Sequence, residues 1–368
     1  MPTSNASIPS VRELLLNRLD SGSWPGARND DYWLVLAVEG GGMRGAVSSG
    51  MLLTLEQLGF RDCFDEVVGT SAGAIAGAFF ATGQGTSGSV LYYTVLNSQR
   101  FVDRRRLLRE RAIMDLDYLF DEAIAAHGFD WDALLDNDIP VWATVSPADP
   151  NDTPHCFLVG GDVENARQVL KASAALPVLT GRSRQIGDKE YIDGGLTEAV
   201  PWSSAIERGA THVLAVRSRG YNQAGLPEEL SALERLTVPR LVRRMHNDHV
   251  ADTVNMSAKR FVNCTEALRS IIEGTGSAVV ARGRPVMIDA VLPAEEVELP
   301  ERLEVDTHLL MNALTGGASA MVKYLDLDGF RVEQRVVVTH PRAPIGRVRT
   351  SALAPVVRDR RRSPRRER

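Results

Sequence analysis

Short apolar runs alternate with helix-length amphipathic segments along the first 220 residues of this chain. Residues 33–38 (WLVLAV) form a continuous apolar run of the kind that becomes a buried strand, and a second such run ends at Gly69. Each run leads into a glycine-containing turn and then into a helical segment, one over 46–58 and one that ends near Thr82. This order predicts neighbouring parallel strands joined by helical crossovers.

The same periodicities continue along the chain. They predict further strands over 140–145, 155–159, 211–216 and 285–292, helices over 11–19, 163–174, 202–208 and 306–325, several short amphipathic helices within 86–137, and a long helical region over 227–272. No internal repeat and no clear linker interrupts this pattern. We therefore expect an α/β protein with a parallel or mixed central sheet flanked by helices, and with a helical C-terminal elaboration.

Composition narrows the functional class. Of the 368 residues, 44% are hydrophobic and 24% are charged, which is typical of a globular protein with a full core. The net charge of -5 argues against a general nucleic-acid binder. Three scattered cysteines (Cys63, Cys156 and Cys264) indicate reduced thiols, and neither a disulfide framework nor a zinc site. The N-terminus has no signal-peptide apolar region and no run is long enough to cross a bilayer, so we expect a cytoplasmic protein.

The turn after the second apolar run reads Gly69-Thr70-Ser71-Ala72-Gly73. G-x-S-x-G between a strand and a helix is the nucleophile-elbow pattern, in which a tight turn exposes a serine hydroxyl beside a helix N-terminus. Glycine is expected at Gly69 and Gly73 because the backbones of strand and helix nearly touch there. The plain alternative is a turn of small residues that happens to contain a serine.

The turn after the first apolar run is a glycine-rich loop, consisting of Gly40, Gly41, Gly42, Met43, Arg44 and Gly45. One interpretation is a dinucleotide fingerprint, which requires an acidic residue at the end of the next strand. Asp62, Asp65 and Glu66 precede that strand instead, and G-x-S-x-G occupies its end. The other interpretation is an oxyanion hole built from successive backbone N–H groups, which we favour. Arg44 could anchor the loop or meet a phosphate headgroup.

A serine nucleophile needs a group that accepts its proton. None of the seven histidines lies at a position that suits a base, since His212 opens a predicted strand and His246 and His249 lie on an arginine-rich helix. Asp193 ends a short apolar stretch and is followed by Gly194 and Gly195. An ordinary Asp-Gly turn would look the same.

Taken together, G-G-G-M-R-G (40–45), G-T-S-A-G (69–73) and D-G-G (193–195) resemble the motifs of the patatin-like phospholipase family. The small-residue block A-S-A-A-L-P (172–177) strengthens the resemblance, which covers about residues 34–217 and is most similar to bacterial patatin-like acyl hydrolases. It implies a three-layer fold and a Ser-Asp dyad without histidine. Ser71 would be the nucleophile, Asp193 the proton acceptor, and the loop 40–45 the oxyanion hole, with no metal and no cofactor.

The resemblance also implies a function. We expect a serine acyl hydrolase that cleaves carboxylic ester bonds of lipids, like a phospholipase A or a lysophospholipase, through an acyl-enzyme intermediate. Its partner would be a lipid or another acyl ester, with no specific nucleic acid. Two alternatives from other classes are a catalytically silent binding protein that keeps the fold, and a nucleotide-binding oxidoreductase that uses the glycine-rich loop.

These interpretations divide the chain into four parts. They are an N-terminal extension (1–31), a patatin-like catalytic domain (32–217), a mostly helical continuation packed on the same domain (218–341), and an Arg/Pro-rich tail (342–368). We predict the tail to be disordered because it lacks the residues of a core. Its last 22 residues hold nine arginines and two acidic residues, so it could contact an anionic membrane peripherally or remain a solvated end without a partner.

Overall fold

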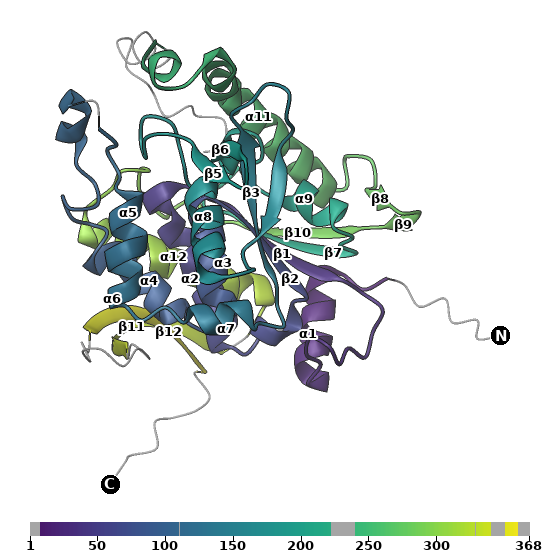
Figure 1. The fold of residues 1–368 in the computed structure, drawn as a ribbon. Helices are drawn as coiled ribbons and strands as arrows, with labels where there is room; N and C mark the ends of the chain where they lie inside the picture. The colour runs from purple at the N-terminus through teal and green to yellow at the C-terminus, as the bar shows by residue number, and fades with distance from the viewer. Residues whose placement is uncertain (1–7, 110, 222–239, 328, 340–349, 360–368) are drawn as a thin grey trace.

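A mixed sheet forms the centre of the computed structural model, which describes residues 8–109, 111–221, 240–327, 329–339 and 350–359 (Figure 1). Its eight strands are β1 (Leu34–Val38), β2 (Glu66–Thr70), β3 (Val141–Pro147), β4 (His155–Leu158), β5 (Arg184–Ile186), β6 (Lys189–Asp193), β7 (His212–Val216) and β10 (Met287–Val291). They lie in the order β10-β7-β1-β2-β3-β6-β5, with β4 also paired to β3. The first five strands in this order, from β10 to β3, are parallel to one another. β4 and β6 pair antiparallel with β3, and β5 pairs antiparallel with β6. The predicted parallel or mixed sheet is confirmed.

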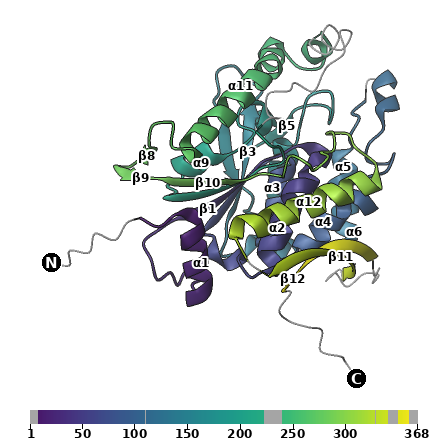
Figure 2. The same ribbon diagram turned by 180° about the vertical axis from the view of Figure 1, so that it is seen from behind.

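Helices cover both faces of this sheet (Figures 1 and 2). Because successive side chains of a strand point to opposite faces, Leu34, Leu36 and Val38 of β1 join one hydrophobic cluster and Val35 and Ala37 join another. The first cluster is completed by α2 (Gly45–Gln57), α3 (Ala72–Ala81), α4 (Gly85–Thr94), α8 (Val163–Ser173) and α12 (Thr307–Leu325), and the second by α9 (Trp202–Glu207) and α11 (Asp248–Ile272). This is the expected three-layer arrangement.

The regions before and after residues 32–217 pack onto the same core. The N-terminal helix α1 (Val11–Ser21) buries Val11, Leu14 and Leu15 in the first cluster. Downstream, β10 extends the central sheet beside β7, and α12 packs along α2. The continuation also contains the short hairpin β8 (Val280–Ala281) and β9 (Arg284–Pro285). Of the long helical region predicted over 227–272, the structure gives a helical stretch over 240–245 and α11, while 222–239 lie outside the described residues.

The predicted disorder from residue 342 is wrong for one stretch. β12 (Thr350–Asp359) pairs antiparallel with β11 (Phe330–Thr339), and both strands pack against α12. Gln57 of α2 joins this ribbon, since its amide donates to the carbonyl oxygen of Pro355 (3.1 Å) and accepts from the N–H of Val357 (2.9 Å). Local sequence patterns do not reveal this ribbon because it depends on long-range contacts. Residues 340–349 and 360–368, with most of the tail arginines, lie outside the described residues.

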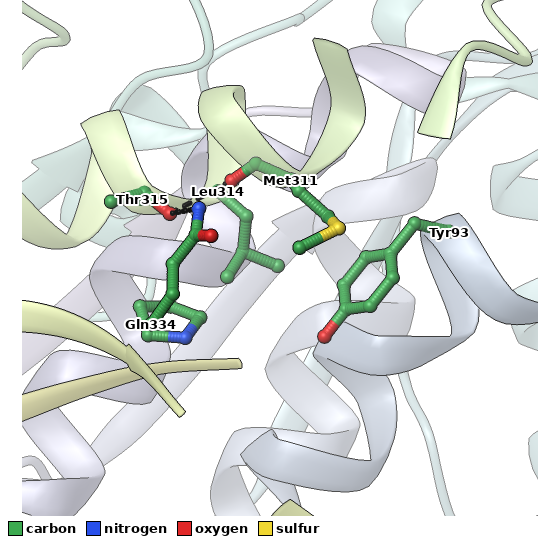
Figure 3. Close-up of a pocket in the computed structure, with 6 residues that line it drawn as sticks. Tyr93, Met311, Leu314, Thr315 and Gln334 are labelled. Atoms are coloured by element: carbon green, nitrogen blue, oxygen red, sulfur yellow. Dashed lines mark hydrogen bonds between the residues drawn. The ribbon is translucent and has the colours of Figure 1, made fainter. Parts of the chain in front are cut away.

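Figure 3 shows the seam where this ribbon meets α4 and α12. A shallow depression there is lined by Tyr93, Met311, Leu314, Thr315, Gln334 and Pro355, and it leaves no room for a water molecule. The amide of Gln334 closes it by donating to the hydroxyl of Thr315 (3.1 Å). None of the predicted site residues lines this depression, so we regard it as a packing contact between elements.

The segment predicted as short amphipathic helices, 86–137, is only partly helical. After α4 it consists of short pieces: the 3₁₀ turn η3 (Arg104–Arg109), α5 (Leu116–Tyr118), the π-helical turn η4 (Leu119–Ala123), α6 (Ile124–Ala126) and α7 (Trp131–Leu135). Among the helices that the structure describes, none combines the length and the apolar character that crossing a membrane would require.

Candidate active site

Ser71 lies at the sharp turn between β2 and α3. Its backbone has φ 55° and ψ -127°, a combination that L-residues other than glycine rarely adopt. The flanking glycines permit this geometry. A Cβ on Gly69 would lie 2.4 Å from the Cα of Ala74, and one on Gly73 would lie 2.4 Å from the carbonyl oxygen of Val38. The turn therefore presents a strained, partly exposed serine at the carboxyl edge of the parallel strands.

Asp193 reaches the same edge from the last residue of β6. Strand β3 lies parallel to β2 and antiparallel to β6, and Val145 of β3 pairs with Asp193. Ser71 Oγ consequently donates a hydrogen bond to Asp193 Oδ2 (2.7 Å), across 122 positions of sequence. The N–H of Gly195 donates to Asp193 Oδ1 (2.7 Å), which fixes the carboxylate from its other side. The structure thus brings together the serine and the aspartate singled out in the sequence.

Burial makes the Asp193 carboxyl group a weaker acid than an ordinary aspartate. Asp193 is 4% exposed, and the desolvation raises its pKa to about 6, although the hydrogen bonds from Ser71 and Gly195 and the charge of Arg302 act in the opposite direction. At neutral pH the group is mostly ionised. It is also a stronger base than an ordinary aspartate, because its pKa lies closer to neutral pH.

The block 172–177 forms hydrogen bonds with the backbones of both Ser71 and Asp193. The Oγ of Ser173 accepts a hydrogen bond from the backbone N–H of Ser71 (2.9 Å). Two residues on, the carbonyl oxygen of Ala175 accepts from the N–H of Asp193 (3.0 Å). In the sequence this block contributed only to the family resemblance. Its physical role is to fix the backbones of both residues relative to each other.

The glycine-rich loop follows β1 and lies directly beside the serine. A Cβ on Gly40 would be 2.9 Å from the Cβ of Ser71. Three of the loop N–H groups are already engaged: Met43 donates to Arg302 O (3.1 Å), Arg44 to Gly41 O (3.2 Å), and Gly45 to Gly42 O and Met43 O. No described residue accepts from the N–H groups of Gly40, Gly41 or Gly42. Of the six loop residues that the sequence suggested for an oxyanion hole, only the first three therefore keep N–H groups that no described residue engages.

A buried ion pair supports this loop from behind. Glu39 and Arg217 are 2% and 0% exposed, and Arg217 Nε donates to Glu39 Oε2 (3.2 Å). The same carboxylate oxygen accepts from the N–H of Ser218 (3.0 Å), while Ser218 Oγ donates to the carbonyl oxygen of Gly40 (2.9 Å). The conformation of Gly40 is thus fixed by residues that lie about 180 positions downstream. Arg44, 5% exposed, is buried at the end of the loop, which favours an anchoring role over contact with a headgroup.

Residues that would support the dinucleotide interpretation are engaged elsewhere. Asp65 forms ion pairs with Arg18 and Arg28 (both 2.7 Å), and Glu66 pairs with Arg208 (2.7 Å). These contacts lie at the amino end of β2, at the edge opposite Ser71. No hydrogen bond joins a described histidine to Ser71 or Asp193.

His212 shows this most clearly, since it is buried at the start of β7. Its imidazole pairs with the carbonyl oxygen of Pro9 (2.9 Å) and with the hydroxyl of Thr211 (3.0 Å). Its burial lowers the pKa of this imidazole below the usual range. His212 therefore holds the start of β7 against the N-terminal segment, in keeping with its predicted place at the start of a strand.

Comparison with known proteins assigns one segment of the chain to a family. Residues 36–206 match the sequence model of the patatin-like phospholipases. This segment belongs to the patatin-like phospholipase family. The "Uncharacterized protein YjjU" of Escherichia coli (strain K12) is 28% identical over 207 residues, which cover 55% of this chain and 56% of that protein. The chain thus matches about half the length of this curated relative.

Among solved structures, VipD from Legionella pneumophila aligns with 81% of this chain and 67% of its own chain, at 12% identity and a TM-score of 0.39.

Within the patatin-like domain, the motif residues were predictable from the sequence, but the residues that hold them in place were not. Ser173 lay within a motif already noted, whereas Arg217 and Arg302 carried no signal because their contacts with the loop cross most of the chain.

Proposed function

We propose that this protein is a serine acyl hydrolase that cleaves carboxylic ester bonds of lipids, with Ser71 and Asp193 as its catalytic dyad. The observation that carries the proposal is the 2.7 Å hydrogen bond from Ser71 Oγ to a buried carboxylate, on a strained turn of a patatin-like domain. The unengaged N–H groups at the start of the glycine-rich loop support it. No described histidine contacts the pair, so the dyad would be complete without one.

The reaction would proceed in two steps. Ser71 Oγ attacks the ester carbonyl carbon while its proton passes to Asp193 Oδ2, and the carbonyl oxygen takes up negative charge beside the N–H groups of Gly40, Gly41 and Gly42. The C–O bond to the alcohol or lysolipid then breaks, and the leaving oxygen takes the proton from Asp193. Water attacks the acyl-Ser71 ester with Asp193 again as base, which releases the fatty acid and restores the serine.

Removal of either dyad residue should abolish hydrolysis. We expect Ser71→Ala and Asp193→Asn each to lower kcat/KM for p-nitrophenyl esters and for defined phospholipids by at least about 10³-fold, with the double variant little worse, because the two residues act as a unit. Full activity of Asp193→Asn would exclude the dyad. Hydrolysis of short esters without any hydrolysis of phospholipids would retain the dyad but exclude a phospholipid substrate.

The stability of Asp193→Asn provides the control for folding. A raised carboxyl pKa means that the folded state binds the proton more tightly than the unfolded state, so ionisation of Asp193 destabilises the native protein at neutral pH. The neutral asparagine avoids this cost. We therefore expect the variant to be more stable above pH 6 by up to about 3 kcal/mol, a gain that disappears below about pH 4. Urea titrations at several pH values measure it.

A further inference from the structure

A basic arm projects from the catalytic domain. We use this name for residues 100–111 of the sequence, of which the described part (100–109 and 111) includes η3 and extends away from the body beside α5 (Figures 1 and 2). The arm contains six arginines (Arg100, Arg104, Arg105, Arg106, Arg109 and Arg111) and two acidic residues, which gives it a net charge of +4 within a chain whose net charge is -5. It is thus a local exception to the acidic character of the protein.

Half of these arginines are engaged in ion pairs at the protein surface. Arg100 pairs with Glu122, Arg104 with Glu301 (3.3 Å) and Arg106 with Asp115 (3.7 Å). The other three, Arg105, Arg109 and Arg111, are exposed and form no ion pair within the described part of the chain. Their positive charges are therefore available to a partner that carries negative charge.

An apolar side chain lies among these charges. Leu107, in the middle of η3, is 39% exposed. A soluble polyanion would match the charges of the arm but gains little from an exposed leucine. An anionic lipid surface suits both features, because arginines attract its headgroups and a leucine enters the acyl boundary.

The arm is connected on both sides to the segments that hold the dyad. At its base, the N–H of Met114 donates to the carbonyl oxygen of Leu179 (2.7 Å), just beyond the block 172–177 that positions Ser71 and Asp193. On its other side, Arg104 pairs with Glu301, the neighbour of Arg302, whose carbonyl oxygen accepts from the glycine-rich loop. A surface bound to the arm would therefore lie next to segments that position Ser71, Asp193 and the glycine-rich loop.

We infer that the basic arm docks on an anionic lipid surface and so brings the Ser71 site to its substrate. The inference rests on the proposed function only for the identity of the substrate, since lipid binding by the arm requires no chemistry. Arg105, Arg109 and Arg111 supply the electrostatic attraction and Leu107 supplies the apolar contact. Phospholipid hydrolysis would then depend on the charge of the surface, whereas hydrolysis of a soluble ester would not.

The test compares two charge-matched variants of the full chain. R105Q/R109Q/R111Q removes three charges from the arm, while K259Q/R282Q/R284Q removes three exposed charges from α11 and from the β8–β9 hairpin. Since each basic residue near an anionic surface strengthens partitioning about fivefold, the arm variant should bind phosphatidylcholine/phosphatidylglycerol vesicles on the order of 100-fold more weakly at low salt. The control variant should bind like the wild type, and Leu107→Ser should bind several-fold more weakly at any salt concentration.

Equal losses in both triple variants, or unchanged binding of the arm variant, would overturn the inference. So would an arm that binds soluble polyglutamate or RNA as tightly as it binds vesicles. Hydrolysis of p-nitrophenyl butyrate, which needs no surface, separates this inference from the proposed function. If the arm variant loses vesicle binding but hydrolyses butyrate like the wild type, both the inference and the proposed function are supported. If the wild type has no esterase activity, only the proposed function is contradicted.

Discussion

The elbow at Ser71 and the glycine-rich loop lie side by side, yet they are held in place in different ways. The turn of the elbow is shaped by close backbone contacts among Gly69, Gly73, Ala74 and the end of β1, all within about 40 residues of sequence, and Ser173 adds one distant hydrogen bond to the N–H of Ser71. The loop depends on Glu39, Arg217, Ser218 and Arg302, three of which lie in the second half of the chain. The elbow is thus built mainly from local contacts, whereas the glycine-rich loop is assembled mainly by the tertiary fold.

The elbow and the loop also affect the stability of the folded protein in different ways. The elbow stores strain, because a non-glycine residue occupies a disfavoured backbone conformation there. The loop instead contains a buried ion pair that must remain complete, since an unpaired buried charge is costly. Substitutions in the two parts should therefore change stability in opposite directions.

The largest effect is expected from the support of the loop. Glu39→Gln leaves the guanidinium of Arg217 buried without its carboxylate, so we expect the free energy of unfolding to fall by about 3–5 kcal/mol in urea titrations at pH 7.5. The matched control is Glu273→Gln, which removes the same group from an exposed pair with Arg269. That change should leave the free energy of unfolding nearly unchanged, because exposed ion pairs contribute little.

A compensating variant makes this prediction more specific. Replacing both partners, as in Glu39→Gln with Arg217→Met, removes the unpaired charge and should recover much of the lost stability. Ester hydrolysis should stay low, because Gly40 loses the hydrogen-bonded scaffold behind it. Equal stability losses for Glu39→Gln and Glu273→Gln would show that the buried pair does not support the loop.

A smaller effect of opposite sign is expected at the elbow. Both Ser71→Gly and Ser71→Ala remove the hydroxyl, but only glycine relieves the strain at φ 55°. We expect the glycine variant to be more stable than the alanine variant by about 1–2 kcal/mol, while both are inactive. Equal stabilities in urea titrations would mean that the turn is not strained.

The contrast also explains what the sequence could predict. β1, β2, α2 and α3 lie within one or two residues of their predicted positions, because apolar runs and flanking glycines determine them locally. Ser71, Asp193 and the glycine-rich loop were recognised from motifs, and the structure brings them together.

What the sequence could not predict depends on distant contacts. The sequence suggests the N–H of Met43 as an oxyanion donor, whereas in the structure it donates to the carbonyl oxygen of Arg302. β12 was predicted to be disordered because of its Pro- and Arg-rich surroundings, yet Ala354 is buried there and Pro355 accepts a hydrogen bond from Gln57. A proline is tolerated in this strand because the ribbon has only two strands, each with one unpaired edge.

The central claim is that Asp193 alone activates Ser71, and the rate of fluorophosphonate labelling tests it most directly. Peptide mapping should place the label on Ser71. The rate should rise with pH through an apparent pKa of about 6, the value for the buried carboxyl group, and should fall by at least about 100-fold in Asp193→Asn. Labelling of another residue, or an Asp193→Asn variant that is labelled at the wild-type rate, would contradict the account.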